Sequence, residues 1–83
     1  MANSGNPPII NNASRFPRDM ARAIKARPTM LRDETPEVVN EVARALARAG
    51  FGAELLDACA EAGLDNARRA AIRAACRNHG VLH

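Results

Sequence analysis

The side chains of this chain best suited to chemistry are its two cysteines and two histidines. Cys76, His79 and His83 have the spacing C-x2-H-x3-H, which is found in zinc sites. Cys59, the other cysteine, could supply a fourth ligand. Gly80 breaks the expected helix between the histidines, and Cys59 has no second cysteine at the spacing that zinc sites use. We therefore expect reduced thiols in a core and no bound metal.

Catalytic residues are not indicated by the remaining polar side chains. Both serines, Ser4 and Ser14, lie near the N-terminus, tyrosine is absent, and neither histidine is paired with a nucleophile in sequence. Glu54, Asp57 and Glu61 share one face of an expected helix, and a solvated acidic face explains them. We expect no catalytic residue and no cofactor, so the protein is predicted not to be an enzyme.

The composition of the chain permits one small domain with a thin core. Its 83 residues include 18 alanines and only 2 aromatic side chains. Alanine favours helices but adds little apolar area, so such a domain is helped by a larger protein partner or by homo-oligomerisation. Small accessory proteins of bacteria and phages often have a similar composition. With no apolar run of membrane-spanning length and no leader pattern, we expect a cytoplasmic protein without membrane contact.

Residues 1–15 are predicted to form an extended N-terminal arm. They contain four asparagines and a Pro-Pro pair without a periodic apolar pattern, which disfavours a helix. Ile9 and Ile10 are the apolar anchor of this arm, and they are expected to dock in a groove of this molecule or of another one. A disordered chain end is the alternative.

Residues 16–83 are predicted to form a single helical domain, so the fold class is all-α, a small bundle of about four short helices. Thr35 and Pro36 are the clearest start signal, as N-cap and first helical residue. Gly50, Gly63 and Gly80 each precede an apolar residue and are expected to end a helix. The helices are expected over residues 17–27, 36–49, 53–62 and 66–79.

Apolar side chains at helical spacing define the expected core. Phe16, Met20 and Ile24 recur every four residues and are predicted to form the buried stripe of the first helix. Met30 and Leu31 are expected to reach the core from the connection over residues 28–34.

The charge of the chain changes sign twice along its length. The net charge is +5 over residues 1–32, −6 over residues 33–65 and +4 over residues 66–83, with +3 for the whole chain. This layout is compatible with a bundle that neutralises itself, or with a basic surface for an acidic partner.

The last expected helix has a basic face. At 100° per residue, Arg69, Arg73 and Arg77 fall close together, and no acidic residue follows Asp65. Guanidinium groups bind carboxylates and phosphates. The alanines of this helix allow close packing, either within the domain or as a docking face. We predict a protein-binding adaptor, inhibitor or assembly factor, with partner contacts at Ile9, Ile10, Arg69, Arg73 and Arg77.

The stretch from Leu55 to Ala74 resembles a helix-turn-helix motif. The residues that match are a small one within the first helix, the turn glycine, the apolar residue after it and an inward residue of the second helix: Cys59, Gly63, Leu64 and Ile72. Six residues past the glycine the motif has an apolar residue where this chain has Arg69, so Ala70 would have to take that place.

The resemblance implies an alternative function, a DNA-binding regulator that acts through residues 64–78. The second helix of the motif would enter the major groove, and a dimer would supply enough affinity. The side chains that would contact nucleic acid are Asn66, Arg68, Arg69, Arg73 and Arg77.

Overall fold

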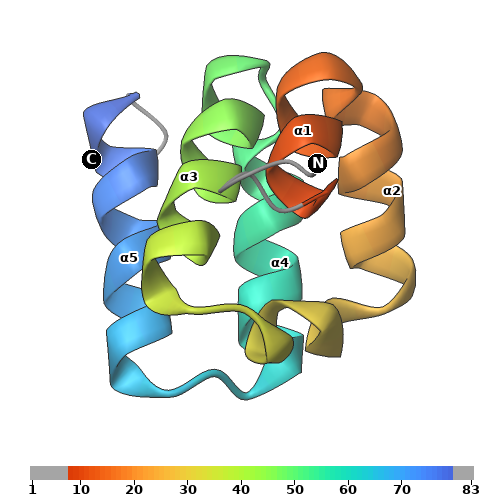
Figure 1. Cartoon of the computed structure of the whole chain (residues 1–83). Coiled ribbons are helices and arrows are strands. Elements are labelled where there is room, and N and C mark those ends of the chain that lie inside the picture. Colours follow the sequence, from red (N-terminus) through yellow and green to blue (C-terminus); the bar gives the residue numbers. More distant parts are fainter. Residues whose placement is uncertain (1–7, 80–83) are drawn as a thin grey trace, which may run out of the picture.

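The computed structural model describes residues 8–79, and all regular structure in this part of the chain is helical (Figure 1). The fold is therefore all-α. No helix among these residues is long and apolar enough to cross a membrane. The described part contains five α-helices and one 3-10 helix: α1 (Pro8–Arg15), α2 (Pro17–Ala26), η1 (Pro28–Asp33), α3 (Pro36–Arg48), α4 (Gly52–Ala62) and α5 (Asn66–Asn78).

Helix α1 corrects the prediction of an extended arm over residues 1–15. Residues 8–15 form this helix, and its Ile9 and Ala13 side chains are 8% and 1% exposed in the core. The helix packs against α2 and α3. Burial of Ile9 and Ala13 compensates for the weak helix propensity of the neighbouring asparagines, which local sequence signals cannot show. Residues 1–7, the rest of the predicted arm, lie outside the described residues.

The boundaries of the other α-helices agree with the local start and stop signals. Pro17 and Pro36 occupy the first turns of α2 and α3, and the Thr35 hydroxyl accepts a hydrogen bond from the Val38 amide at 3.2 Å. Gly50 and Gly63 have positive φ angles of 94° and 65° and end α3 and α4. The third glycine signal, at Gly80, lies outside the described residues.

The expected count of four helices is too low because α1 and η1 are helical as well. The predicted connection over residues 28–34 contains η1, which packs against α2 and α4. Leu31 is fully buried and Met30 is half-buried, so both reach the core as expected.

Helix α3 is the centre of the bundle. It packs against α1, α2, α4 and α5, and its contact with α5 is the most extensive (Figure 1). In this view α5 and α2 lie at opposite edges of the molecule. The largest fully buried side chains are aliphatic except for one thiol: Ile24, Leu31, Leu46, Leu55, Ile72, Val39, Val42 and Cys76.

Phe16 does not belong to the buried stripe of α2, contrary to the sequence prediction. Met20 and Ile24 are 4% and 1% exposed, whereas Phe16 is 51% exposed. Phe16 lies between α1 and α2 with φ −134° and ψ 64°, which is outside the helical region. A side chain at such a residue does not follow the helical spacing, so the period of four does not apply to it.

Candidate interaction surfaces

Helix α5 has one face fixed against the bundle. Ile72, Ala75 and Cys76 are fully buried, and the Asn40 Nδ2 group of α3 donates a 2.9 Å hydrogen bond to the Ala71 carbonyl. Because this contact sets the rotation of α5, the opposite side of the helix faces solvent. The exposed residues on that side are Asn66, Ala67, Arg69, Ala70, Arg73, Ala74, Arg77 and Asn78.

The arginine face, which we define as Arg69, Arg73 and Arg77, is assembled as the sequence predicts. All three side chains are exposed. Arg69 donates a hydrogen bond to the Asn66 side-chain oxygen, one turn away. The ion pairs found within residues 8–79 involve other arginines, namely Arg44 with Glu41 at 3.7 Å and Arg68 with Asp65 at 3.0 Å. The arginine face therefore has no carboxylate partner among the described residues.

Arg68 has a structural role, which separates it from the other predicted nucleic-acid contacts. Its Nε donates a 2.7 Å hydrogen bond to the Glu34 carbonyl, and its Nη1 bonds the Asp65 carboxylate at 3.0 Å. The Arg68 hydrogen bond holds the pKa of Asp65 below its ordinary value. These contacts tie the start of α5 to the segment before α3.

A groove between α4 and α5 lies beside the arginine face. We call it the basic groove, and its volume is about 280 Å³. Its apolar floor includes Leu56, Cys59 and Leu64, and its charged rim is formed by Arg69 and Arg73. Burial raises the pKa of the Cys59 thiol, while the positive charges of Arg69 and Arg73 act in the opposite direction. Both arginines line the same groove as this thiol.

The two cysteines are free thiols in different environments. Cys76 is fully buried, and burial followed by the proximity of Cys59 raises its pKa. His79 is exposed at the end of α5, and His83 lies outside the described residues. No group of three or more metal-ligating side chains comes together within residues 8–79.

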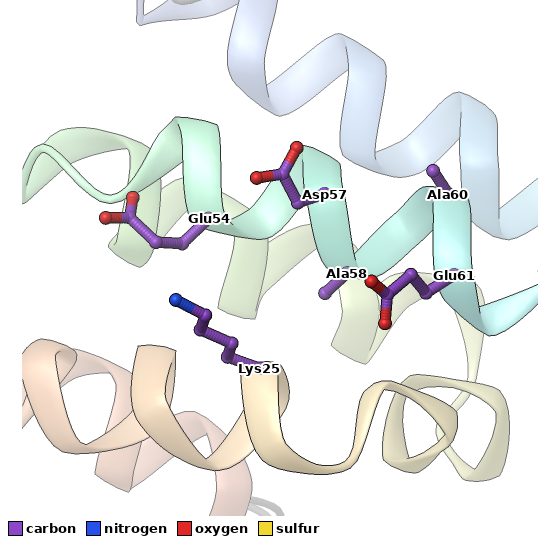
Figure 2. A pocket seen from close by; sticks show the side chains of 6 residues that line it. All are labelled: Lys25, Glu54, Asp57, Ala58, Ala60 and Glu61. Atoms are coloured by element: carbon purple, nitrogen blue, oxygen red, sulfur yellow. The ribbon is translucent and has the colours of Figure 1, made fainter.

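The acidic residues of α4 line a second groove, together with Lys25 of α2. Figure 2 shows the Lys25 side chain pointing toward Glu54 across this groove of about 300 Å³, with the Asp57 carboxylate pointing away from Lys25 and Glu61 one turn along from Asp57. Ala60 lines both this groove and the basic groove. Helix α4 therefore separates an acidic surface from a basic one, which the order of charges along the chain did not reveal.

The predicted partner contacts at the N-terminus lie mainly within the molecule. Ile9 is a core residue, and Ile10 is half-buried against the core.

Sequence analysis missed a surface formed by Phe16 and the half-buried Phe51, which line one shallow groove. The Arg15 Cζ atom lies 5.7 Å from the centroid of the Phe16 ring, a cation-π distance. The sequence signal that could have indicated the exposure of Phe16 is its position directly before Pro17, outside the helix that begins there.

The connection between α4 and α5 keeps part of the helix-turn-helix pattern. Gly63 has the left-handed conformation, and Leu64 and Ile72 are 5% and 0% exposed. Arg69 and Ala70 are both exposed, so neither fills the apolar position of the motif.

Comparisons of the chain with protein-family models, with curated proteins and with solved structures find no match.

Proposed function

We propose that this protein is a small, non-enzymatic binding module whose α5 helix engages an acidic surface of a larger protein, as an adaptor, inhibitor or assembly factor does. The observation that carries the proposal is the arginine face, three exposed guanidinium groups without a carboxylate partner among the described residues. Arginine pairs with carboxylates in a bidentate geometry that favours specific contacts. The small side chains of Ala70 and Ala74 beside it allow a partner to approach the helix closely.

An acidic protein surface fits the neighbourhood of α5 better than a nucleic acid does. Arg68, one of the expected DNA contacts, is engaged by the fold through the Glu34 carbonyl and the Asp65 carboxylate. Arg69 and Ala70 are both exposed, so the apolar position of the helix-turn-helix motif is not filled. A carboxylate-bearing protein segment needs no such motif to pair with the arginine face.

A DNA-binding regulator is the second candidate function. The observation in its favour is the left-handed turn at Gly63, which leads to a helix with Asn66 and Arg69 exposed near its start. Asparagine and arginine are side chains that read base edges in the major groove. The two candidates differ in which polyanion they bind.

The test compares a labelled acidic peptide of glutamate residues with a labelled duplex of about 20 base pairs, by fluorescence anisotropy at several salt concentrations. The variant Arg73→Ser/Arg77→Ser removes two charges of the arginine face. The matched control, Arg18→Ser/Arg22→Ser, removes two exposed charges from α2. We expect the α5 variant to weaken peptide binding about fivefold and the α2 control less than about twofold.

Three results of this experiment would redirect the proposal. Equal weakening by the two variants would show that net charge alone attracts the peptide. Salt-dependent duplex binding without peptide binding would establish the second candidate. Self-association that disappears in the α5 variant, measured by sedimentation, would identify a second copy as the acidic partner, because each copy carries carboxylates on α4.

A further inference from the structure

The floor of the basic groove is apolar and only partly covered by the molecule itself. Leu56 and Cys59 are half-buried at the edge of the core, and Leu64 is 5% exposed beneath the turn. The volume of about 280 Å³ is close to the lower end of the range for small-ligand sites, about 300 Å³. The groove is therefore large enough for one bulky side chain, and covering its floor would remove apolar area from water.

The rim of the groove is positive and has no acidic residue in its lining. Arg69 and Arg73 stand one helical turn apart, and the hydrogen bond to Asn66 orients the Arg69 guanidinium. The α4 carboxylates Glu54, Asp57 and Glu61 line the other groove, and Ala60 lines both. An occupant of the groove would thus meet two positive charges above an apolar surface, and the complementary group is an apolar side chain flanked by carboxylates.

We infer that the basic groove is the anchoring site for the protein partner, and that it receives a bulky aliphatic side chain from an acidic segment whose carboxylates bind Arg69 and Arg73. This inference rests on the proposed function and adds the chemistry of the recognised segment. Arg77 lies further along α5 and does not line the groove, so it contributes charge to the arginine face without contacting the anchor.

The experiment uses the whole protein and two synthetic peptides, one alternating Glu and Leu and one alternating Glu and Gln. Both peptides have the same charge, so a difference between them reports the apolar anchor. We expect the Leu peptide to bind about tenfold more tightly, because partial burial of leucine is worth about one factor of ten. The variant Leu56→Gln should reduce this preference, and the readout is the ratio of the affinities for the two peptides.

Alkylation of Cys59 gives a second readout that needs no variant. Cys59 is on the groove floor, whereas Cys76 is fully buried and acts as an internal control. A bound anchor should cover Cys59, so saturating Leu peptide should slow its alkylation at least about fivefold and leave Cys76 unaffected. This measurement remains valid if Leu56→Gln fails to fold.

The outcomes separate the groove from the proposed function. Equal affinity for both peptides with Cys59 unprotected would overturn the groove inference while leaving the arginine face as the binding surface. Tighter binding of the Leu peptide without protection of Cys59 would place the apolar contact elsewhere and also overturn it. Failure of both peptides to bind would refute the proposed function, and the groove inference with it.

Discussion

Arg68 is where a structural role and a binding role can be separated by one substitution. Its Nε and Nη1 groups bond the Glu34 carbonyl at 2.7 Å and the Asp65 carboxylate at 3.0 Å. The variant Arg68→Met keeps most of the aliphatic stem and removes every donor. It should therefore detach the start of α5 from the segment before α3 while leaving the apolar contacts in place.

The size of the effect follows from the Glu34 hydrogen bond. A hydrogen bond with a charged partner contributes about 1.5–3 kcal/mol, and the low end applies because the Arg68 side chain is 24% exposed. The exposed pair with Asp65 adds little, since water screens it. We expect a loss of about 1.5 kcal/mol, which lowers Tm by about 6–12 °C in a domain of this size.

Urea unfolding followed by far-ultraviolet circular dichroism measures this loss. Arg69→Met is the matched control, because Arg69 is exposed and its side chain bonds only Asn66 among residues 8–79. The control should change the free energy of unfolding by less than about 0.5 kcal/mol.

The pH dependence reports on the other contact of Arg68, its exposed pair with the Asp65 carboxylate, and the effect should be small. The pKa of Asp65 is lower in the folded state than in the unfolded chain, so its contribution is present above the unfolded pKa and is lost as pH falls. Between about pH 5 and pH 3, the wild type should thus lose more stability than Arg68→Met does.

Two results would refute this reasoning about Arg68. Equal unfolding curves for Arg68→Met and Arg69→Met would show that the bond to Glu34 does not hold α5 in place. Unchanged stability together with a selective loss of duplex binding in Arg68→Met would return Arg68 to the set of nucleic-acid contacts.

Three further predictions test the packing of the bundle and its thiols. Ile9→Ala should lower the free energy of unfolding by about 2 kcal/mol because Ile9 is in the core. Phe16→Ala removes an exposed ring and should lower this free energy by less than about 1 kcal/mol. Similar losses for the two variants in chemical denaturation would contradict the packing of α1. Asn40→Asp should lower the free energy of unfolding by about 1–3 kcal/mol, because it replaces the donor to the Ala71 carbonyl of α5 with an acceptor. A variant that melts at the same temperature as the wild type would exclude that bond. Cys59 should be alkylated before Cys76, with both rates rising about tenfold per pH unit below the raised pKa values; faster reaction of Cys76, detected by mass spectrometry, would mean that α5 opens readily.

Local signals in the sequence were sufficient for most helix boundaries. Proline at a first helical position, the Thr35 cap and glycine in the left-handed conformation act within a few residues, so their effects can be read from the chain. The arginine face was also predictable, because Arg69, Arg73 and Arg77 lie on one helix whose geometry is known once the helix is assigned. These features depend only on neighbouring residues.

Contacts between distant residues were decided by the tertiary structure. Residues 8–15 are helical because α1, with Ile9 in the core, packs against α2 and α3. Arg68 has a structural role because the segment before α3 places the Glu34 carbonyl within hydrogen-bond distance of it. The basic groove exists only because the packing of α4 and α5 brings Leu56 and Arg73 to the same groove. Helical periodicity specifies which residues share a face, but the partner of each face depends on how the helices pack, and that is set by the whole core.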